Sequence, residues 1–240
     1  MSDRPQPQSP SELLIVGAGG LGRETAQAVA AARAAGLGWR LLGFLDDDPL
    51  LAGGEVGGTR VLGGSELSRS VPHARVLLCV AGVRDPLVRL RVARRMDLPA
   101  ERYATFVHPS VEVSADSTIG AGSILLAQSV LTAAVRIGEH VAVMPRVVLT
   151  HDDVVEDYAT IASGVALAGG VHVERGAYIG AGATVREYVR IGAGSVVGMG
   201  SVVLDDIPSG QVWAGNPARH LRTLAFSEDV RTSTANRGGS

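Results

Sequence analysis

The stretch Thr150–Asp153 places a histidine, His151, directly before two aspartates. A carboxylate beside an imidazole can fix its tautomer and stabilise the imidazolium, so a histidine in this setting can act as a general base near neutral pH. From the residues alone, a surface histidine among solvated acids is the simpler interpretation. His151 is therefore a candidate base whose role depends on the scaffold that holds it.

A second candidate site is the G-x-G-x-x-G pattern of Gly17, Gly19 and Gly22, between an apolar run and an Ala-rich segment. Such glycines permit a tight turn and let backbone N–H groups approach a phosphate at a helix N-terminus. Asp46 ends the next apolar run, and an acid near this spacing can bind a ribose, so the pattern taken alone fits NAD. Glycines that only turn the chain are the alternative, and the missing Lys-Ser/Thr pair excludes a P-loop.

Composition excludes several classes of protein. The 240 residues carry 22 Lys and Arg against 24 Asp and Glu, so no broad basic surface suggests nucleic acid. The first residues lack the apolar stretch of a signal peptide, and no apolar run is long enough to span a membrane. We therefore expect a cytoplasmic protein with no nucleic-acid or membrane partner.

The chain divides into two halves with different periodicities. Residues 1–11 are rich in Pro, Gln and Ser, and we expect them to be disordered. Residues 12–105 alternate short apolar runs with helical segments, which predicts a small Rossmann-like domain with a parallel α/β sheet. Its expected strands and helices are strands at 12–16, 39–45 and 75–82 and helices at 23–36 and 85–96.

From Val107 onward every sixth residue is aliphatic, as far as Val203. The residue two positions before each aliphatic is Ser, Ala or Val from Val111 on, with Asp153 as the exception. A helix of 3.6 residues per turn cannot keep this period, whereas short strands joined by tight corners can. The pattern predicts a β-solenoid over residues 106–220 in which three hexads close one coil, with a flexible tail at 221–240.

The repeat resembles the hexapeptide family of acyltransferases, which fold as a left-handed parallel β-helix and usually form trimers. The whole chain is similar to bacterial nucleotide-sugar N-acetyltransferases that act on 4-amino sugars, and to their sialic-acid O-acetyltransferase relatives. The segments that carry this resemblance are GAGGLGRE, GFLDDD, HPSVEVSADSTIG, LTHDDVVEDYATIASGVALAGGVHV, YIGAGATV and GNPAR.

The resemblance implies a role for each matching residue. His151 would take the proton from the acceptor amine with Asp152 as its partner, and no metal would be required. Relatives commonly have a small residue where Asp153 stands, and the sequence does not explain this difference. The residues implied in binding acetyl-CoA are Thr160, Gly169, Ala181 and Met199, and those implied in binding the nucleotide sugar are Gly19, Gly20, Leu21, Asp46 and Asp47.

The expected function is transfer of acetyl from acetyl-CoA to the amino group of a UDP-linked 4-amino sugar, by direct attack on the thioester within a homotrimer. Two alternatives remain from the sequence: O-acetylation of a sugar hydroxyl by the same base, and a non-catalytic solenoid whose first domain only binds a nucleotide. A zinc-dependent carbonic anhydrase is disfavoured because His140, His151 and His172 lack the ligand spacing of such enzymes. The sequence does not identify the sugar or the pathway.

Overall fold

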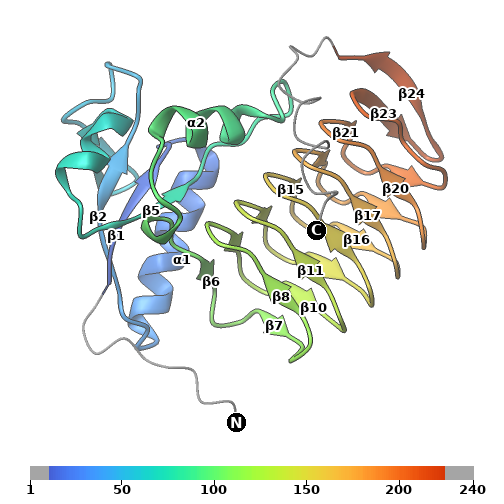
Figure 1. Ribbon diagram of the computed structural model, residues 1–240, viewed down its shortest axis with the longest axis horizontal. Helices are drawn as coiled ribbons and strands as arrows, with labels where there is room; N and C mark the ends of the chain where they lie inside the picture. The colour runs from blue at the N-terminus through green and yellow to red at the C-terminus, as the bar shows by residue number, and fades with distance from the viewer. Residues whose placement is uncertain (1–10, 225–240) are drawn as a thin grey trace, which may run out of the picture.

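The computed structural model describes residues 11–224, in which an α/β domain is followed by a long stack of β coils (Figure 1). Disorder is predicted over residues 1–11 and flexibility over residues 221–240; residues 1–10 and 225–240 lie outside the described residues, whereas Ser11 belongs to strand β1 (Ser11–Val16). At the C-terminal end of the array, the last strand continues to Thr223, three residues beyond the expected end of the solenoid at 220. In the described part of the chain, no helix is long and apolar enough to cross a membrane.

The first domain is a five-stranded sheet in the order β3-β4-β2-β1-β5, in which β3 alone is antiparallel to its neighbour. Residues Leu13 to Val16 of the central strand are buried, as expected for a parallel sheet that is covered on both faces. This domain is the Rossmann-like unit that the alternating pattern predicted. Its elements are β1 (Ser11–Val16), α1 (Gly20–Ala34), β2 (Trp39–Leu45), β3 (Glu55–Val56), β4 (Thr59–Gly63), η1 (Ser65–Ser70), β5 (Arg75–Leu78), α2 (Val88–Met96) and η2 (Ala100–Arg102).

Two glycines make the tight connection between β1 and α1 possible. Gly17 has φ of +99°, a conformation that side chains rarely adopt. A Cβ on Gly22 would lie 1.9 Å from the carbonyl oxygen of Gly17, so the helix could not begin so close to the strand with any larger residue. The loop therefore opens at the N-terminus of α1, three residues before the expected start of that helix at 23.

The second domain is a left-handed β-helix built from two-residue strands. Each strand pairs in parallel with the strand 18 residues further along, as Val130 does with Val148, so three strands make one coil. The strands are β6 (Phe106–Val107), β7 (Glu112–Val113), β8 (Thr118–Ile119), β9 (Ile124–Leu125), β10 (Val130–Leu131), β11 (Arg136–Ile137), β12 (Ala142–Val143), β13 (Val148–Leu149), β14 (Val154–Val155), β15 (Thr160–Ile161), β16 (Ala166–Leu167), β17 (His172–Val173), β18 (Tyr178–Ile179), β19 (Thr184–Val185), β20 (Arg190–Ile191), β21 (Val196–Val197) and β22 (Val202–Val203), and a hairpin of β23 (Gln211–Gly215) and β24 (Ala218–Thr223) ends the array.

The period-six aliphatic is the second residue of every two-residue strand and points into the prism, where these side chains form one continuous core. The small residue two positions earlier is also buried at the inner side of a corner, except Ser117, which is half-buried. From residues 120–123 onward, one residue of each corner has a left-handed backbone, which is a glycine in some coils and a residue such as Asp152 or Tyr188 in others. The hexad pattern therefore reflects two sets of inward side chains: the aliphatic residues of the strands and the small residues of the corners.

The prism has three corners, which we number along the chain. The first corner follows the sheet of β6, β9, β12, β15, β18 and β21 and comprises residues 108–111, 126–129, 144–147, 162–165, 180–183 and 198–201. The second corner follows the six-stranded sheet of β7, β10, β13, β16, β19 and β22 and comprises residues 114–117, 132–135, 150–153, 168–171 and 186–189. The third corner follows the sheet of β8, β11, β14, β17 and β20 and comprises residues 120–123, 138–141, 156–159, 174–177 and 192–195.

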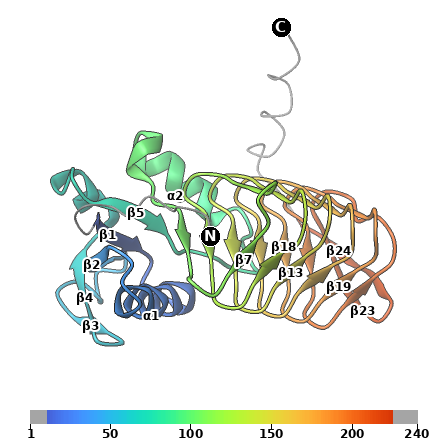
Figure 2. The same ribbon diagram turned by 90° about the horizontal axis from the view of Figure 1, so that it is seen from below.

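The α/β domain sits at the end of the prism that carries the first coils, with α1 and α2 next to these coils (Figure 2). The main polar contact is Arg89 of α2, which is 2% exposed. Its guanidinium donates to the carbonyl oxygens of Val80, His140 and Ala159, at 3.1, 2.8 and 3.2 Å, and also to the hydroxyl of Thr160 at 2.8 Å. One buried arginine thus joins the two domains through both of their backbones.

Candidate active site

The His151–Asp152 pair lies at the second corner, in the turn between β13 and β14, with both side chains exposed. Nδ1 of His151 is 3.0 Å from Oδ2 of Asp152. A carboxylate only accepts hydrogen bonds, so Nδ1 carries the proton and donates it, and Nε2 is left free to accept another. This is the arrangement that a general base requires.

The imidazole of His151 lies against the backbone of Gly169 in the next coil. A Cβ on Gly169 would be 2.2 Å from both Cε1 and Nε2 of the ring, so only glycine leaves room for it. Within residues 11–224 the N–H of Gly169 donates to no other group. The corner therefore places a free ring nitrogen and an unused backbone donor side by side.

Tyr188 is a further side chain at this corner that the sequence reasoning missed. Its ring lies over Gly170, where a Cβ would be 2.6 Å from Cδ1, and the side chain is exposed. His151 and Tyr188 thus contact the adjacent glycines 169 and 170 from neighbouring coils. An aromatic residue 18 positions after a glycine pair, in an array with this period, is a pattern that could have predicted the contact.

Asp153 does not face solvent with its neighbours but is fully buried at the inner side of the corner. Its Oδ1 accepts from the N–H of Val171 at 2.9 Å and its Oδ2 from the N–H of Thr150 at 2.8 Å. Burial raises the pKa of the carboxyl to about 7, although these N–H groups and the nearby His151 act to lower it. The exception in the hexad pattern is therefore a hydrogen-bonded carboxyl in the core.

The glycine loop and the aspartates after β2 form the second part of the site. Gly19 and Gly20 are exposed at the N-terminus of α1, whereas Leu21 is buried. Asp46 accepts from the N–H of Ala18 at 2.8 Å and so fixes the loop. Asp47 accepts from the N–H of Ser65 at 2.8 Å and pairs with Arg95; burial raises the pKa of Asp47, but these partners outweigh it and the pKa is lowered.

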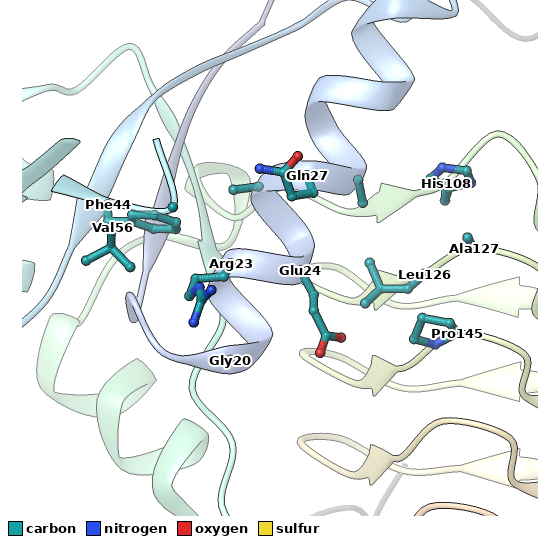
Figure 3. Close-up of a pocket in the computed structure, with 13 residues that line it drawn as sticks. Gly20, Arg23, Glu24, Gln27, Phe44, Val56, His108, Leu126, Ala127 and Pro145 are labelled. Atoms are coloured by element: carbon teal, nitrogen blue, oxygen red, sulfur yellow. The ribbon is translucent and has the colours of Figure 1, made fainter. Parts of the chain in front are cut away.

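A cavity of about 600 Å³ lies between α1 and the first corner of the β-helix (Figure 3). Arg23, Glu24 and Gln27 line it from the helix, while His108 and Leu126 belong to the opposite wall. Gly20 is also part of the lining, so the cavity reaches the N-terminus of α1, where anions are favoured. Charged and polar groups on one wall and apolar groups on the other suit a polar ligand with a flat ring.

The residues expected to bind the acetyl donor do not converge within one chain. Gly169 lies at the second corner beside His151, whereas Ala181 and Met199 lie at the first corner, across the six-stranded sheet. Met199 is 79% exposed. Thr160 is buried, and its hydroxyl accepts a hydrogen bond from Arg89, which occupies it in this structure. Among the described residues there is also no cluster of three or more side chains that could hold a metal ion.

Comparisons with known proteins agree with this architecture. Residues 12–96 match the PglD N-terminal domain family. The acetyltransferase domain of PglB from Neisseria gonorrhoeae superposes with a TM-score of 0.74 at 28% identity, over 88% of this chain and 99% of that one, and it has also been solved with acetyl coenzyme A. A search of curated protein sequences finds no significant match.

Two further structures match over a similar length. PerB from Caulobacter crescentus, solved in complex with CoA and GDP-perosamine, has a TM-score of 0.76 at 27% identity, over 88% of this chain and 98% of its own. WeeI from Acinetobacter baumannii has a TM-score of 0.72 at 27% identity, over 88% of this chain and 100% of its own. With its Rossmann-like domain, its β-helix and these matches, the chain is an acyltransferase similar over its described length to the sugar N-acetyltransferases of the hexapeptide family.

Proposed function

We propose that the protein transfers the acetyl group of acetyl-CoA to the amino group of a nucleotide-linked amino sugar, of the UDP-4-amino-sugar type, with His151 as general base. The observation that carries this proposal is the hydrogen-bonded His151–Asp152 pair, whose free Nε2 lies against Gly169. Further support comes from PerB, a perosamine N-acetyltransferase by its name, which was solved with CoA and a nucleotide sugar.

The reaction would proceed by direct attack. The sugar amine bonds to the thioester carbon while Nε2 of His151 takes its proton, and Asp152 stabilises the imidazolium through Nδ1. The N–H of Gly169 donates to the oxyanion that forms, which is the role of an unused backbone donor beside a base. The carbon–sulfur bond then breaks, and the coenzyme A thiolate takes the proton from the imidazolium.

The nucleotide sugar would occupy the cavity beside α1. The phosphates would meet the N–H groups of Gly19 and Gly20 at the helix N-terminus, and Arg23 supplies a positive charge on the same wall. Leu21 would contribute packing, and Asp46 and Asp47 would hold the loops around the base of the nucleotide. Acetyl-CoA would contact Gly169, Ala181 and Met199, and Thr160, whose hydroxyl accepts from Arg89, would contact it by donating its O–H.

The experiment for this function is incubation of the purified protein with acetyl-CoA and a panel of UDP- and GDP-linked amino sugars, followed by mass spectrometry. We expect a gain of one acetyl group on an amino sugar, and none on the matched sugar that carries a hydroxyl in place of the amine. Acetylation of the hydroxyl sugar instead would contradict N-acetyl transfer, and no product from the whole panel would contradict the proposed substrate class.

We further propose that the active site forms between protomers of a homotrimer. The outer face of the six-stranded sheet presents Val130, Val148, Ala166 and Val202 together with Glu112 and Thr184, and its four aliphatic side chains suit packing around a three-fold axis. The first and second corners bound this sheet on its two sides. Packing of such faces would bring the second corner of one protomer, with His151, to the first corner of its neighbour, with Ala181, Met199 and the cavity.

A mixing experiment tests the shared site. His151→Ala removes the base, and Asp46→Ala weakens the nucleotide pocket, so each variant alone is expected to be nearly inactive. When the two are co-expressed and co-assembled, sites that combine an intact corner with a neighbour's intact pocket should restore part of the activity. Light scattering checks that the preparation is trimeric, and pull-down through a tag on one variant checks that the trimers are mixed. No recovery in mixed trimers would place the whole site in one chain, and a monomer would contradict the assembly itself.

A further inference from the structure

The buried carboxyl of Asp153 makes one contact that other corners make with serine. At the same corner two coils earlier along this stack, Ser117 accepts the N–H of Val135, 18 residues on, at 3.0 Å. Asp153 accepts the N–H of Val171, also 18 residues on, at 2.9 Å. A serine would have been enough for this contact, so the reason for an aspartate lies in its second oxygen.

That second oxygen opens the regular ladder at Thr150. In the coils before and after, the first corner residue donates its N–H to a strand carbonyl 17 residues on, as Thr132 does to Leu149 and Ala168 does to Val185. Thr150 instead donates its N–H to Oδ2 of Asp153 at 2.8 Å. The carbonyl of Leu167, left without that partner, accepts from the hydroxyl of Thr150 at 3.0 Å. Among the first corner residues from His108 to Gly198, all described, Thr150 is the one whose N–H does not donate to a carbonyl of the next coil.

This change of hydrogen-bond partners occurs at Thr150, the residue that precedes His151. The turn is tied to the next coil by Thr150 through Leu167, by the carbonyl of His151 through the N–H of Gly170 at 2.8 Å, and by Asp153 through Val171. These bonds fix the turn that carries the imidazole relative to the two glycines beneath it. We propose that Asp153 is a positioning residue that opens the ladder at Thr150 and thereby aims the His151 ring over Gly169. The inference rests on the proposed role of His151.

The charge of Asp153 acts on the same histidine. The charged groups near its carboxyl are His151 and Asp152 of its own turn, whereas the stacked corner positions in the coils on either side hold Val135 and Val171. Burial raises the pKa of Asp153 to about 7, so the carboxylate is populated in neutral and mildly basic solution. His151 acts to lower the pKa of this carboxyl, so the two side chains interact within the same turn.

This charge destabilises the fold while it serves the site. The pKa of the carboxyl is higher in the folded protein than the value of about 3.9 in an unfolded chain. The folded protein therefore binds the proton of Asp153 more strongly than the unfolded chain does. The stability that this proton contributes is complete below pH ~3.9 and is lost as the pH rises through about 7. Replacing Asp153 by serine should remove this loss and keep the contact with Val171.

The test is Asp153→Ser compared with Val135→Ser, which introduces the same side chain at the stacked position one coil earlier. For Asp153→Ser at pH 8 we expect an unfolding midpoint equal to or above that of the wild type, a kcat lowered about 100-fold, and little change in KM for acetyl-CoA, because the base is misplaced rather than removed. For Val135→Ser we expect a lower midpoint with near-normal kcat. Parallel losses of stability and kcat in both variants would reduce Asp153 to a structural residue and overturn the proposal.

A second measurement does not depend on activity. Nitrogen-15 NMR of the imidazole reports which ring nitrogen carries the proton and whether it is hydrogen-bonded. In Asp153→Ser the hydrogen-bonded Nδ1 signature of His151 should be lost. Asp153→Asn keeps one oxygen and the shape of the side chain, so its spectrum should be intermediate. If the serine variant does not fold, the asparagine variant replaces it. An unchanged His151 spectrum contradicts the proposal. If the wild type acetylates nothing but the spectra differ as expected, the proposed function fails and the positioning role stands.

Discussion

Replacing His151 by alanine is expected to lower kcat by about 10²–10⁴-fold, the usual contribution of a positioned proton acceptor. The imidazole would meet the reacting amine rather than the pantetheine arm, so KM for acetyl-CoA should change little. The fold should be unaffected because the side chain is exposed at a corner and adds nothing to the aliphatic stack. Steady-state kinetics with the acceptor found by the screen, together with circular dichroism, would check both expectations.

The β-helix supplies a matched control for this substitution. Nε2 of His172, on strand β17, is 2.8 Å from Oε1 of Glu156, so this is a second histidine–carboxylate pair in the β-helix. His172→Ala should leave kcat within about twofold. Asp152→Asn should lower kcat less than His151→Ala, because it weakens the base without removing it. A near-normal kcat for His151→Ala would show that His151 is only a surface residue.

Replacing Arg89 by alanine is expected to destabilise the protein by about 3–5 kcal/mol, because its buried partners would lose a charged hydrogen-bond donor. The guanidinium is fully enclosed, and burial lowers its pKa to about 10, which still leaves it charged at neutral pH. Its acceptors are the hydroxyl of Thr160 and the carbonyl oxygens of Val80, His140, Tyr158 and Ala159. Urea unfolding followed by circular dichroism measures the change.

Arg91 on the same helix provides the control for that prediction. It pairs with Asp85 at the surface, where both side chains are more than 40% exposed. Such pairs contribute about 0–1 kcal/mol, so Arg91→Ala should be nearly neutral. Arg89→Ala should also make the α/β domain more sensitive to proteases than the β-helix, since the bonds between them are lost. Equal effects of the two substitutions would mean that Arg89 does not join the domains.

The sequence predicted the β-helix well because its determinants are local and repeated. Each period-six aliphatic falls in a strand, and the expected 18-residue coil matches the observed pairing. The contact of His151 with Asp152 joins adjacent residues, so the motif could indicate it directly. The partners of Asp153 were beyond reach, because they depend on one backbone N–H leaving a ladder that the pattern makes look uniform.

The junction between the domains could not be predicted in this way. Arg89 stands in the segment VRLRVARRM among other arginines, and nothing in that pattern marks it as the buried one. Its burial follows from how α2 docks against coils about 50 to 70 residues later in the chain. The same docking covers Thr160, whose hydroxyl accepts from Arg89, and local pattern alone could not indicate this.

The docking through Arg89 has a consequence for how such chains can change in length. Its contacts at His140 and Ala159 bracket His151 in the chain, so the first domain and the base are anchored to the same part of the array. Insertion of one whole 18-residue coil after Val203 would move the end of the prism by about 4.8 Å without altering that anchored part or the positions of Ala181 and Met199. Loss of a coil between His108 and His140 would instead shift the cavity wall against α1. Lineages of this architecture are therefore free to lengthen at the C-terminal end and constrained in coil number at the N-terminal end.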